Sequence, residues 1–341
     1  MNATPLPMRA RLIDVANAAG VTKSVVSRAL NGDTTLSIRD ETRARILETA
    51  LALNYEPHAG ARALAGARTR SIALLVPDLT NAVYARIARG TYLRARERGF
   101  VVLLAEDAEW SETQSDYTDL VSAGRVEGLL IASVREKHPL LEEGRLDNVP
   151  HVFVNRTVTG SNRNVGVDMA NASKTALDYL YGLGHRTFGH ISGPGDVSPA
   201  RERERGFVLE AVALGITRPC VVHEPYTEAG GYVATQRILD TDPGVTAIYA
   251  GTLPQSIGAL KALHDLGKRV PEDVSLLSYD DMPVAAYLQP SLTTMALPLQ
   301  ELGTAATDAL LDQLSGVTPK DVVLTKQPEV IERDSTAPPR Q

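Results

Sequence analysis

The chain has little of what redox chemistry, metal binding or a membrane location would need. Its 341 residues include one cysteine, one tryptophan and only 5% aromatic side chains. A single cysteine excludes an intramolecular disulfide and a cysteine-based metal cluster, and the apolar run Cys-Val-Val at Cys220 predicts a buried strand residue. No apolar run approaches the about 20 residues of a membrane-spanning helix, and the first ten residues do not resemble a secretory signal. The sequence therefore predicts a cytoplasmic protein.

Sequence signatures of common enzyme classes are also missing. The glycines at Gly193 and Gly195 do not form Gly-x-Gly-x-x-Gly, and neither a Walker-type Gly-Lys-Ser/Thr nor a Gly-x-Ser-x-Gly motif occurs. Four histidines stand singly rather than at the spacing of metal ligands: His151, His185, His190 and His223. An enzyme is therefore a weak alternative, and we expect no catalytic residue, no metal ion and no cofactor.

The charge is distributed unevenly along the chain. Residues 1–70 carry ten Lys and Arg against six Asp and Glu, a net charge of +4, whereas the remainder carries −10 of the total of −6. A basic N-terminal segment on an acidic body suits a polyanionic partner for that segment alone, because the remainder would repel phosphates. A membrane surface is a poorer partner, since the segment has no wide apolar stripe.

Residues 12–31 have the pattern of two short helices joined by a tight turn. The first helix has apolar residues at 3.6-residue spacing, and Gly20 follows where the chain must turn sharply. Thr22 is expected to cap the second helix, whose apolar residues point back at the first. A third helix is predicted over residues 40–54, so that three helices form one headpiece in residues 1–57.

The second helix carries a polar stripe on the side away from the first. The stripe contains Ser24, Ser27, Arg28 and Asn31, with Lys23 beside it at the helix start. Hydroxyl, amide and cationic groups on one helix face suit the major groove of DNA. The same pattern also describes an ordinary helical hairpin whose polar stripe faces water. The basic charge of the segment favours the DNA-binding interpretation.

Residues 58–70 are rich in alanine but also contain Gly60 and Gly66. A helix this short, with two glycines, is not stable in isolation. We therefore interpret the segment as a conditional hinge helix or linker between the headpiece and the rest of the chain.

From Ser71 onward, apolar strands alternate with amphipathic helices, which is typical of an α/β protein with doubly wound parallel sheets. The first set has strands near residues 72–78, 101–107, 128–133 and 151–155, and helices near 82–98, 112–124 and 137–146. The second set has strands near 188–192, 220–224, 247–251 and 275–281, and helices near 170–183, 200–214, 230–239 and 255–266. Two such lobes imply a cleft, and ligands of these sheets bind at the carboxyl ends of the strands.

Several motifs, in order along nearly the whole chain, resemble one protein family. They are VANAAGVTKSVVSRALNG near the N-terminus, followed by VPDLTNAVYARIARG, GHRTFGHISGP, ERERGF, VSLLSYDDMPVAAYLQPSLTTM and ERDSTAPP. In these motifs the chain resembles the LacI family of bacterial repressors. The resemblance implies a homodimer in which two headpieces read a near-palindromic double-stranded DNA operator. It also implies a hinge helix in the minor groove and a small molecule in the cleft that changes the geometry of the headpieces.

The resemblance implies roles for residues of the headpiece and the hinge. Lys23 and Ser24 match two base-reading positions at the start of the recognition helix, and Arg28 matches a third, where a guanidinium can bond to guanine. Further contact positions are Thr22 and Ser27, which match phosphate-binding positions, Asn31 close behind them, and Ala61 and Leu64, the pair that enters the minor groove.

The resemblance also implies an effector site in the cleft of a two-lobed, periplasmic-binding-protein-like domain. Asp280 matches an acidic residue that accepts hydrogen bonds from ligand hydroxyl or amine groups, and Arg203 matches an arginine that bonds to ligand oxygens. Asn155 stands where many members have Asp. Asn81 and Tyr84 stand where the first lobe faces the cleft.

Three positions depart from the family pattern and bear on the effector. Thr252 and Leu253 replace a common Asn-Asp pair, and Leu297 stands where glutamine is frequent. The changes make the second lobe less polar than a typical hexose pocket. Thr252 is kept as a candidate contact, and a carbohydrate-like effector is expected.

The predicted effector and dimerisation domain spans residues 71–341 in two lobes. The N-lobe contains residues of about 71–166 and 298–326, and the C-lobe about 167–297 and 327–341. Two alternatives without catalysis stay open: a ligand-independent regulator that uses the lobes only for dimerisation, and a solute-binding protein. The second would need a signal peptide and no headpiece. An inducer and a corepressor would use the same residues, so the sequence does not distinguish them.

Overall fold

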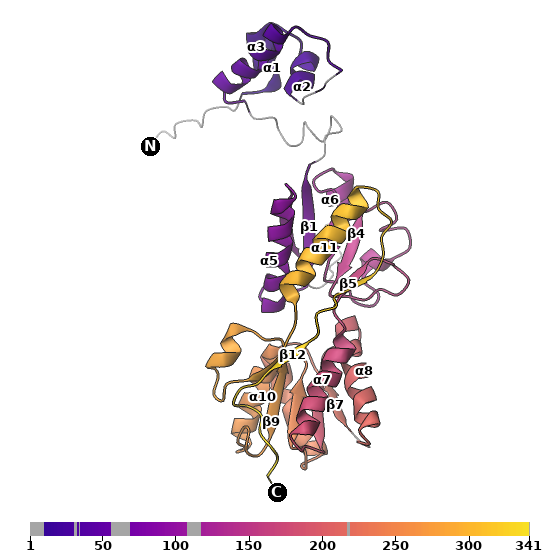
Figure 1. Ribbon diagram of the computed structural model, residues 1–341, viewed down its shortest axis with the longest axis vertical. Helices are drawn as coiled ribbons and strands as arrows, with labels where there is room; N and C mark the ends of the chain where they lie inside the picture. Colours follow the sequence, from indigo (N-terminus) through magenta and orange to yellow (C-terminus); the bar gives the residue numbers. More distant parts are fainter. Residues whose placement is uncertain are drawn as a thin grey trace. The chain divides into compact units, whose positions relative to one another are not determined.

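The structure, a computed structural model, describes residues 10–30, 33, 35–55, 69–107, 117–216 and 219–340. The chain forms two compact units, residues 1–69 and 70–341, whose helices and strands are labelled in Figure 1. The predicted hinge over residues 58–70 falls almost wholly outside the described residues.

The first unit is a bundle of three short helices, α1 (Leu12–Ala19), α2 (Lys23–Leu30) and α3 (Asp40–Ala52). Gly20 ends α1 with a left-handed backbone, φ +66°, which side-chain-bearing residues rarely adopt, and this permits the tight turn into α2. Small and branched apolar side chains form the core of the unit: Val15, Ala16, Ala19, Val26, Ala29, Leu36, Ile46 and Ala50. The predicted helix-turn-helix followed by a third helix is confirmed.

The second unit contains two six-stranded sheets, one in each lobe. The N-lobe sheet has the order β11-β5-β4-β3-β1-β2, and the C-lobe sheet has the order β12-β10-β9-β8-β6-β7. The N-lobe strands are β1 (Ser71–Val76), β2 (Val101–Glu106), β3 (Leu129–Ile131), β4 (His151–Val154), β5 (Asn164–Gly166) and β11 (Val322–Val323). The C-lobe strands are β6 (Phe188–Ser192), β7 (Cys220–His223), β8 (Ala247–Ala250), β9 (Ser275–Tyr279), β10 (Thr293–Ala296) and β12 (Glu329–Ile331).

Helices lie on the faces of these sheets, which is why the central strands are continuous apolar runs rather than alternating ones. β1, for example, is buried throughout from Ile72 to Val76. All neighbouring strands are parallel except β12, which pairs antiparallel with β10. α5 (Ala82–Glu97) and α11 (Leu299–Leu314) pack side by side over the N-lobe sheet (Figure 1). The predicted doubly wound α/β architecture is confirmed.

Most of the remaining helices agree with the sequence pattern, but one prediction is wrong, and the helix predicted over residues 112–124 is seen only as the short α6, since residues 112–116 lie outside the described residues. They are α6 (Thr118–Ser122), α7 (Met169–Gly182), α8 (Ser198–Ala213), α9 (Glu228–Thr241) and α10 (Leu253–Asp265), with 3₁₀ turns η1 (Pro139–Leu141) and η2 (Pro283–Tyr287). The helix predicted over residues 137–146 is wrong, because only η1 forms there. The backbone turns extended at Glu142, and Gly144 adopts φ +82°, a conformation that an α-helix cannot contain.

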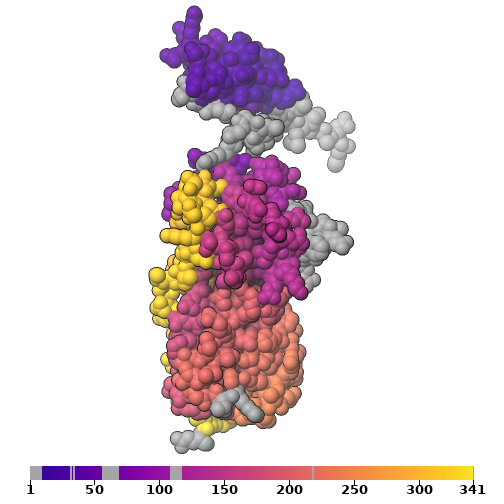
Figure 2. Space-filling view, turned by 90° about the vertical axis from the view of Figure 1, so that its right-hand side faces the viewer, coloured from indigo at the N-terminus to yellow at the C-terminus, as the bar shows by residue number. Residues whose placement is uncertain are grey.

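Each lobe is built from separate stretches of the chain. After β5 the chain builds most of the C-lobe, returns to the N-lobe for α11 and β11, and ends in the C-lobe with β12. Figure 2 shows the yellow C-terminal stretch against the magenta N-lobe. The predicted pattern of elements does not include α11, β5, β10, β11 or β12.

Two further expectations concern single features. Cys220 lies on β7, at the edge of the C-lobe sheet, and is half-buried rather than buried, since β7 has a neighbouring strand on one side only. Across the described ranges, no helix combines the length and the apolar character that crossing a bilayer requires.

Candidate functional site

The helix α2 carries four of the predicted DNA contacts, and Thr22 directly precedes it. Thr22 accepts a hydrogen bond from the backbone N–H of Val25 (3.4 Å) and so caps the helix, as predicted. Lys23 and Ser24 are exposed in the first turn, and Ser27 is half-buried one turn later. The polar and apolar sides of α2 are therefore separated as the sequence pattern indicates.

Arg28 is held by a loop that follows α2. Its Nε donates to Oδ2 of Asp33 (2.7 Å), and its Nη2 donates to the hydroxyl of Thr35 (2.9 Å). Hydrogen bonds from Thr35 and from Arg28 lower the pKa of Asp33 to about 2, so this carboxylate stays ionised at neutral pH. These two hydrogen bonds fix the direction of the Arg28 side chain and leave the other N–H groups of its planar guanidinium available.

Three predicted DNA contacts cannot be located. Asn31, Ala61 and Leu64 lie outside the described residues.

The C-lobe brings Arg203 against two tyrosines. Arg203 lies on α8 and is 6% exposed; its guanidinium lies 4.6 Å from the ring centre of Tyr279 and 5.3 Å from that of Tyr226. Its Nη2 donates to the hydroxyl of Tyr226. A Cβ at Gly193 would overlap ring atoms Cε1 and Cζ of Tyr226, so glycine at this position lets the ring lie beside Arg203.

Asp280 directly follows β9 at its carboxyl end. Its backbone is left-handed, φ +72°, and the residue is 4% exposed. Burial raises the pKa of Asp280 to about 6, and the opposing charges of Arg203 and Arg86 limit the rise. A buried carboxylate beside a guanidinium can accept hydrogen bonds from ligand hydroxyl groups.

Thr252 has a structural role at the start of α10. Its hydroxyl accepts a hydrogen bond from the N–H of Gln255 (3.4 Å) and donates to Oε1 of the same residue (3.2 Å). Nε2 of Gln255 donates to the backbone oxygens of Ser192, Glu224 and Pro225. Thr252 and Gln255 thus connect the start of α10 to the end of β6 and to the loop that leads to Tyr226.

The N-lobe contributes Tyr84 and the segment that follows β4. Asn155 is buried with φ +55°, and Arg156 beside it is 5% exposed. Arg156 donates to the backbone oxygens of Val134 (3.1 Å) and Asn155 (2.8 Å) and to the hydroxyl of Tyr84 (2.9 Å). Asn81 caps α5 by accepting from the N–H of Val83 (3.0 Å).

These groups of the two lobes face one another. Arg156 and Tyr84 act electrostatically on Tyr226 of the C-lobe, and Arg86 acts on Asp280. Both lobes also line two hollows, of about 500 Å³ beside α5 and η2 and of about 200 Å³ beside the start of α8; Arg86 lines the first, and neither contains a predicted site residue. The structure therefore brings Tyr84, Asn155, Arg203 and Asp280 to one interlobe region, with Asn81 and Thr252 capping helices nearby.

A Ser-His-Asp cluster also occurs in the N-lobe, at the carboxyl ends of β2 and β3. Ser133 donates to Oδ2 of Asp107 (2.5 Å), and Nε2 of His138 lies 3.2 Å from the same oxygen. Because the serine bonds to the carboxylate and not to the histidine, the three side chains do not have the serine–histidine–acid order of a hydrolase triad. Among the described residues, no group of three or more His, Cys, Asp or Glu could hold a metal ion.

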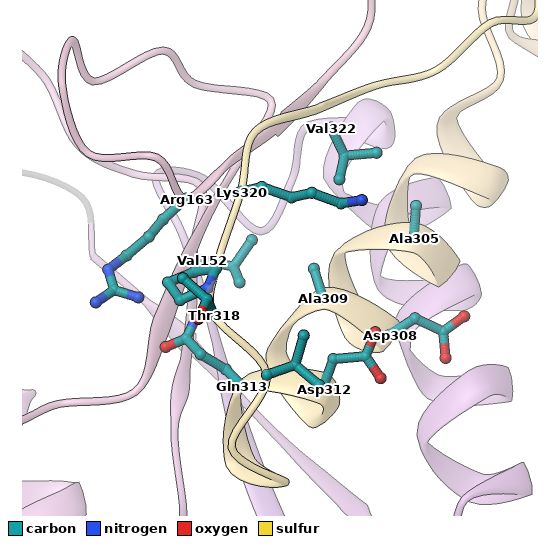
Figure 3. Close-up of a pocket in the computed structure, with 12 residues that line it drawn as sticks. Val152, Arg163, Ala305, Asp308, Ala309, Asp312, Gln313, Thr318, Lys320 and Val322 are labelled. Atoms are coloured by element: carbon teal, nitrogen blue, oxygen red, sulfur yellow. The ribbon is translucent and has the colours of Figure 1, made fainter.

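A further cavity of about 280 Å³ lies wholly in the N-lobe, between α11, β4 and the segment that leads into β11 (Figure 3). Lys320, Asp308 and Asp312 line it together with Ala305 and Val322. The carboxylate of Asp308 is paired with Arg94 on α5 and with Arg98, which directly follows that helix. This cavity contains none of the predicted site residues, so it is separate from the interlobe site.

Four residues of the site are not predicted from the sequence: Tyr226, Arg156, Arg86 and Gln255. The first two had a usable signal, because each follows an apolar strand, at the sheet edge where ligands of parallel sheets bind. Arg86 and Gln255 lie within helices, and only the folded structure brings them to the site.

Comparison with known proteins places this arrangement in a family. Residues 11–58 match the model of the bacterial regulatory proteins of the lacI family, and residues 177–336 match a periplasmic binding protein-like domain. The repressor PurR of Edwardsiella ictaluri is 30% identical over 335 residues, which cover 96% of this chain and 97% of that protein. The chain belongs to the LacI family.

Two other similar proteins extend the comparison. The ribose operon repressor of Halalkalibacterium halodurans is 31% identical over 301 residues, 88% of this chain and 89% of that protein. The solved complex of the transcriptional regulator CelR with cellobiose is 29% identical, with a TM-score of 0.73 over 96% of this chain and all of that one. The similarity thus includes the headpiece and both lobes.

Proposed function

We propose that this LacI family protein is a dimeric transcriptional repressor that binds a near-palindromic operator, and that a small molecule between its lobes controls its affinity for DNA. The observation that carries the proposal is the division of α2 into two sides. Lys23, Ser24 and Arg28 are exposed, while Val26 and Ala29 pack into the headpiece core. Because its polar side is exposed and its apolar side is packed in the core, α2 can enter the major groove while the headpiece stays folded.

On the DNA side, Lys23, Ser24 and Arg28 read base edges. The hydrogen bond from Arg28 to Asp33 supports this role, because a guanidinium with a fixed direction loses less conformational freedom on binding guanine. Phosphate contacts are assigned to Thr22 and Ser27, a nearby contact to Asn31, and the minor groove to Ala61 and Leu64.

On the effector side, Arg203 and Asp280 bind ligand oxygens, and Tyr84, Asn155 and Asn81 complete the site from the N-lobe. Thr252 acts chiefly through Gln255, to which its hydroxyl is bonded. One relative is a ribose operon repressor and another is a regulator solved in complex with cellobiose, which supports a carbohydrate-like effector for this chain. The ligand shifts DNA affinity by binding more tightly to one lobe arrangement than to the other.

The second copy of the chain docks on the free edge of the N-lobe sheet. Among the described residues no strand pairs with the outer side of β2, and its apolar residues Val101, Leu103 and Leu104 are exposed, as is Tyr92 on α5. An apolar edge strand would otherwise recruit other chains, so a closed pair of identical edges removes the hazard. DNA as the partner also fits a cytoplasmic location.

The test is selection of DNA by the full-length protein from a random double-stranded library. We expect enrichment of one sequence with two related half-sites in inverted order. Enrichment of no sequence would contradict the proposal. Enrichment of a single half-site would contradict the dimer.

A further inference from the structure

Four charged residues that line the hollow of about 200 Å³ form two ion pairs between the lobes. Arg135 of the N-lobe pairs with Asp196 of the C-lobe, and its Nη1 lies 3.5 Å from the carboxylate Oδ2. Glu136 of the N-lobe pairs with Arg201 on α8, whose Nη1 lies 2.8 Å from Oε1. The backbone N–H of Glu136 also donates to the carbonyl oxygen of Asp196 (2.9 Å). We call these four residues the interlobe clasp.

The N-lobe half of the interlobe clasp lies on a loop that is fixed at both ends. Ser133 before it and His138 after it both contact Oδ2 of Asp107, which is buried at the end of β2. Because the loop is already fixed, Arg135 and Glu136 lose less conformational freedom when they contact the C-lobe. The Ser-His-Asp cluster therefore supports the interlobe clasp.

The C-lobe half of the interlobe clasp is connected to the effector site through α8. Arg201 and Arg203 lie two residues apart on this helix. Ser198, the first residue of α8, accepts a hydrogen bond from the backbone N–H of Thr157 in the N-lobe (3.0 Å). A movement of α8 away from the N-lobe would therefore break these contacts and displace Arg203 at the same time.

The strength of these ion pairs suits a contact that opens and closes. Each of the four side chains is between 43% and 59% exposed. Exposed ion pairs stabilise a structure only weakly, and salt screens them, whereas removing one partner of a buried pair is strongly destabilising. The binding of a small molecule can therefore supply enough free energy to open the interlobe clasp.

We propose that the interlobe clasp is a conformational device. It stabilises the lobe arrangement of this structure over an alternative in which α8 lies farther from the loop at residues 133–138. It thereby sets the affinity of the protein for its operator before any effector binds. The inference rests on the proposed function, in which the arrangement of the lobes controls the headpieces, and it gives the four residues a role that needs no contact with the effector.

The distance between the lobes tests the interlobe clasp without DNA. Asp119→Cys on α6 and Asp240→Cys on α9, in a Cys220→Ser background, place one spin label on each lobe at exposed positions. The labelled full-length protein is diluted with unlabelled protein, so that pulsed electron paramagnetic resonance measures distances within one chain. Glu136→Arg and Arg201→Glu each place like charges across the clasp. Each should increase the population of a second label distance at least about twofold.

A charge exchange separates the ion pair from other effects of the substitutions. The double variant with Glu136→Arg and Arg201→Glu again has opposite charges and should return to the wild-type distance distribution. The matched control is Arg205→Glu, at an exposed position of α8 that has no ion pair or hydrogen bond to the N-lobe among the described residues; it should behave like the wild type. An unchanged distribution in both single variants would contradict the proposal. A double variant that stays altered would also contradict it, because the effect would then not come from the pair.

The same variants connect the interlobe clasp to DNA binding. Without effector, Glu136→Arg and Arg201→Glu should change the dissociation constant for the selected operator about twofold or more, both in the same direction, and the double variant should restore it. Wild-type operator affinity in variants whose lobes have moved would contradict the regulatory role. A DNA selection that yields no operator would instead contradict the proposed function, and the distance measurement would still show whether the clasp holds the lobes.

Discussion

Tyr226 and Arg203 form a pair at the centre of the C-lobe side of the site. The tyrosine hydroxyl accepts a hydrogen bond from the guanidinium, and the ring lies over Gly193 in the space that a larger residue would fill. The pair joins the loop after β7 to the helix α8, two elements that also face the N-lobe. A change that displaces the ring therefore reaches the effector site without touching the headpiece.

Gly193→Ala should displace the Tyr226 ring and weaken effector binding about tenfold or more, because the new methyl group overlaps the ring. Operator binding without effector should stay at the wild-type level. Calorimetry and a DNA-binding titration measure the two effects. Gly195→Ala is the matched control, since nothing lies within 4 Å of a Cβ at that position. Wild-type effector affinity in Gly193→Ala would show that the ring does not contribute.

Asp280→Asn should stabilise the protein at neutral pH. Burial raises the pKa of Asp280 to about 6, above its value in the unfolded chain, so the folded state binds the proton more tightly. Protonation of Asp280 therefore stabilises the folded wild type in acid, and this contribution to the free energy of unfolding is lost as the pH rises through 6. Above pH 6 the free energy of unfolding of the variant should exceed that of the wild type by about 2–3 kcal/mol, and the difference should shrink towards pH 4.

Urea unfolding of the full chain between pH 4 and 8 measures this dependence. Asp240→Asn, which replaces an exposed carboxyl group on α9, is the control and should not change the pH profile relative to wild type. Parallel profiles for the wild type and Asp280→Asn would mean that the carboxyl group is not shifted.

Arg28→Ala should cost about 1–3 kcal/mol of binding free energy at one operator base pair and relax the preference there. The reason is the loss of a guanidinium fork aimed by Asp33. Asp33→Asn should give a smaller loss at the same base pair, because the arginine remains but is less firmly directed. Competition binding against operators substituted at single positions measures both. A loss of equal size on random DNA would instead assign Arg28 to phosphate contact.

Leu103→Glu should separate the dimer, because it places a charge on the apolar edge of β2. Sedimentation velocity should show monomers at concentrations at which the wild type is dimeric. Val212→Glu is the control, since Val212 on α8 is 67% exposed, as Val101 on β2 is, but lies on the other lobe. A dimer that survives Leu103→Glu and dissociates in Val212→Glu would move the interface to the C-lobe.

The sequence predicts the central strands and main helices of the fold well because their patterns are local. Strands such as β1 and β9 are continuous apolar runs, and the headpiece helices have apolar residues at helical spacing. The short strands β5, β11 and β12 have no such pattern, since their pairing partners define them. The prediction of a helix over residues 137–146 is wrong because it rests on residue spacing alone, which does not show that Gly144 adopts a positive φ.

The residues of the site likewise divide into those that local motifs predict and those that only the folded structure brings together. Arg203 and Asp280 could be named because they stand in motifs that resemble a family, whereas Arg156 and Gln255 act through contacts with residues distant in sequence. The bond between Arg28 and Asp33 depends on the conformation of the loop after α2, which residue spacing does not determine. Thr252 was predicted as a ligand contact, and its hydrogen bonds to Gln255 were not foreseen.

The central claim is that a molecule bound between the lobes controls binding of DNA by the headpieces. The most direct measurement is the dissociation constant of the full-length protein for its selected operator, with and without a saturating concentration of the compound that binds most tightly in a thermal-stability screen of sugars, sugar phosphates and polyols. We predict a change of about fivefold or more, in either direction, which corresponds to a coupling free energy of about 1 kcal/mol or more. An unchanged dissociation constant would contradict the account and support a regulator that works without a ligand.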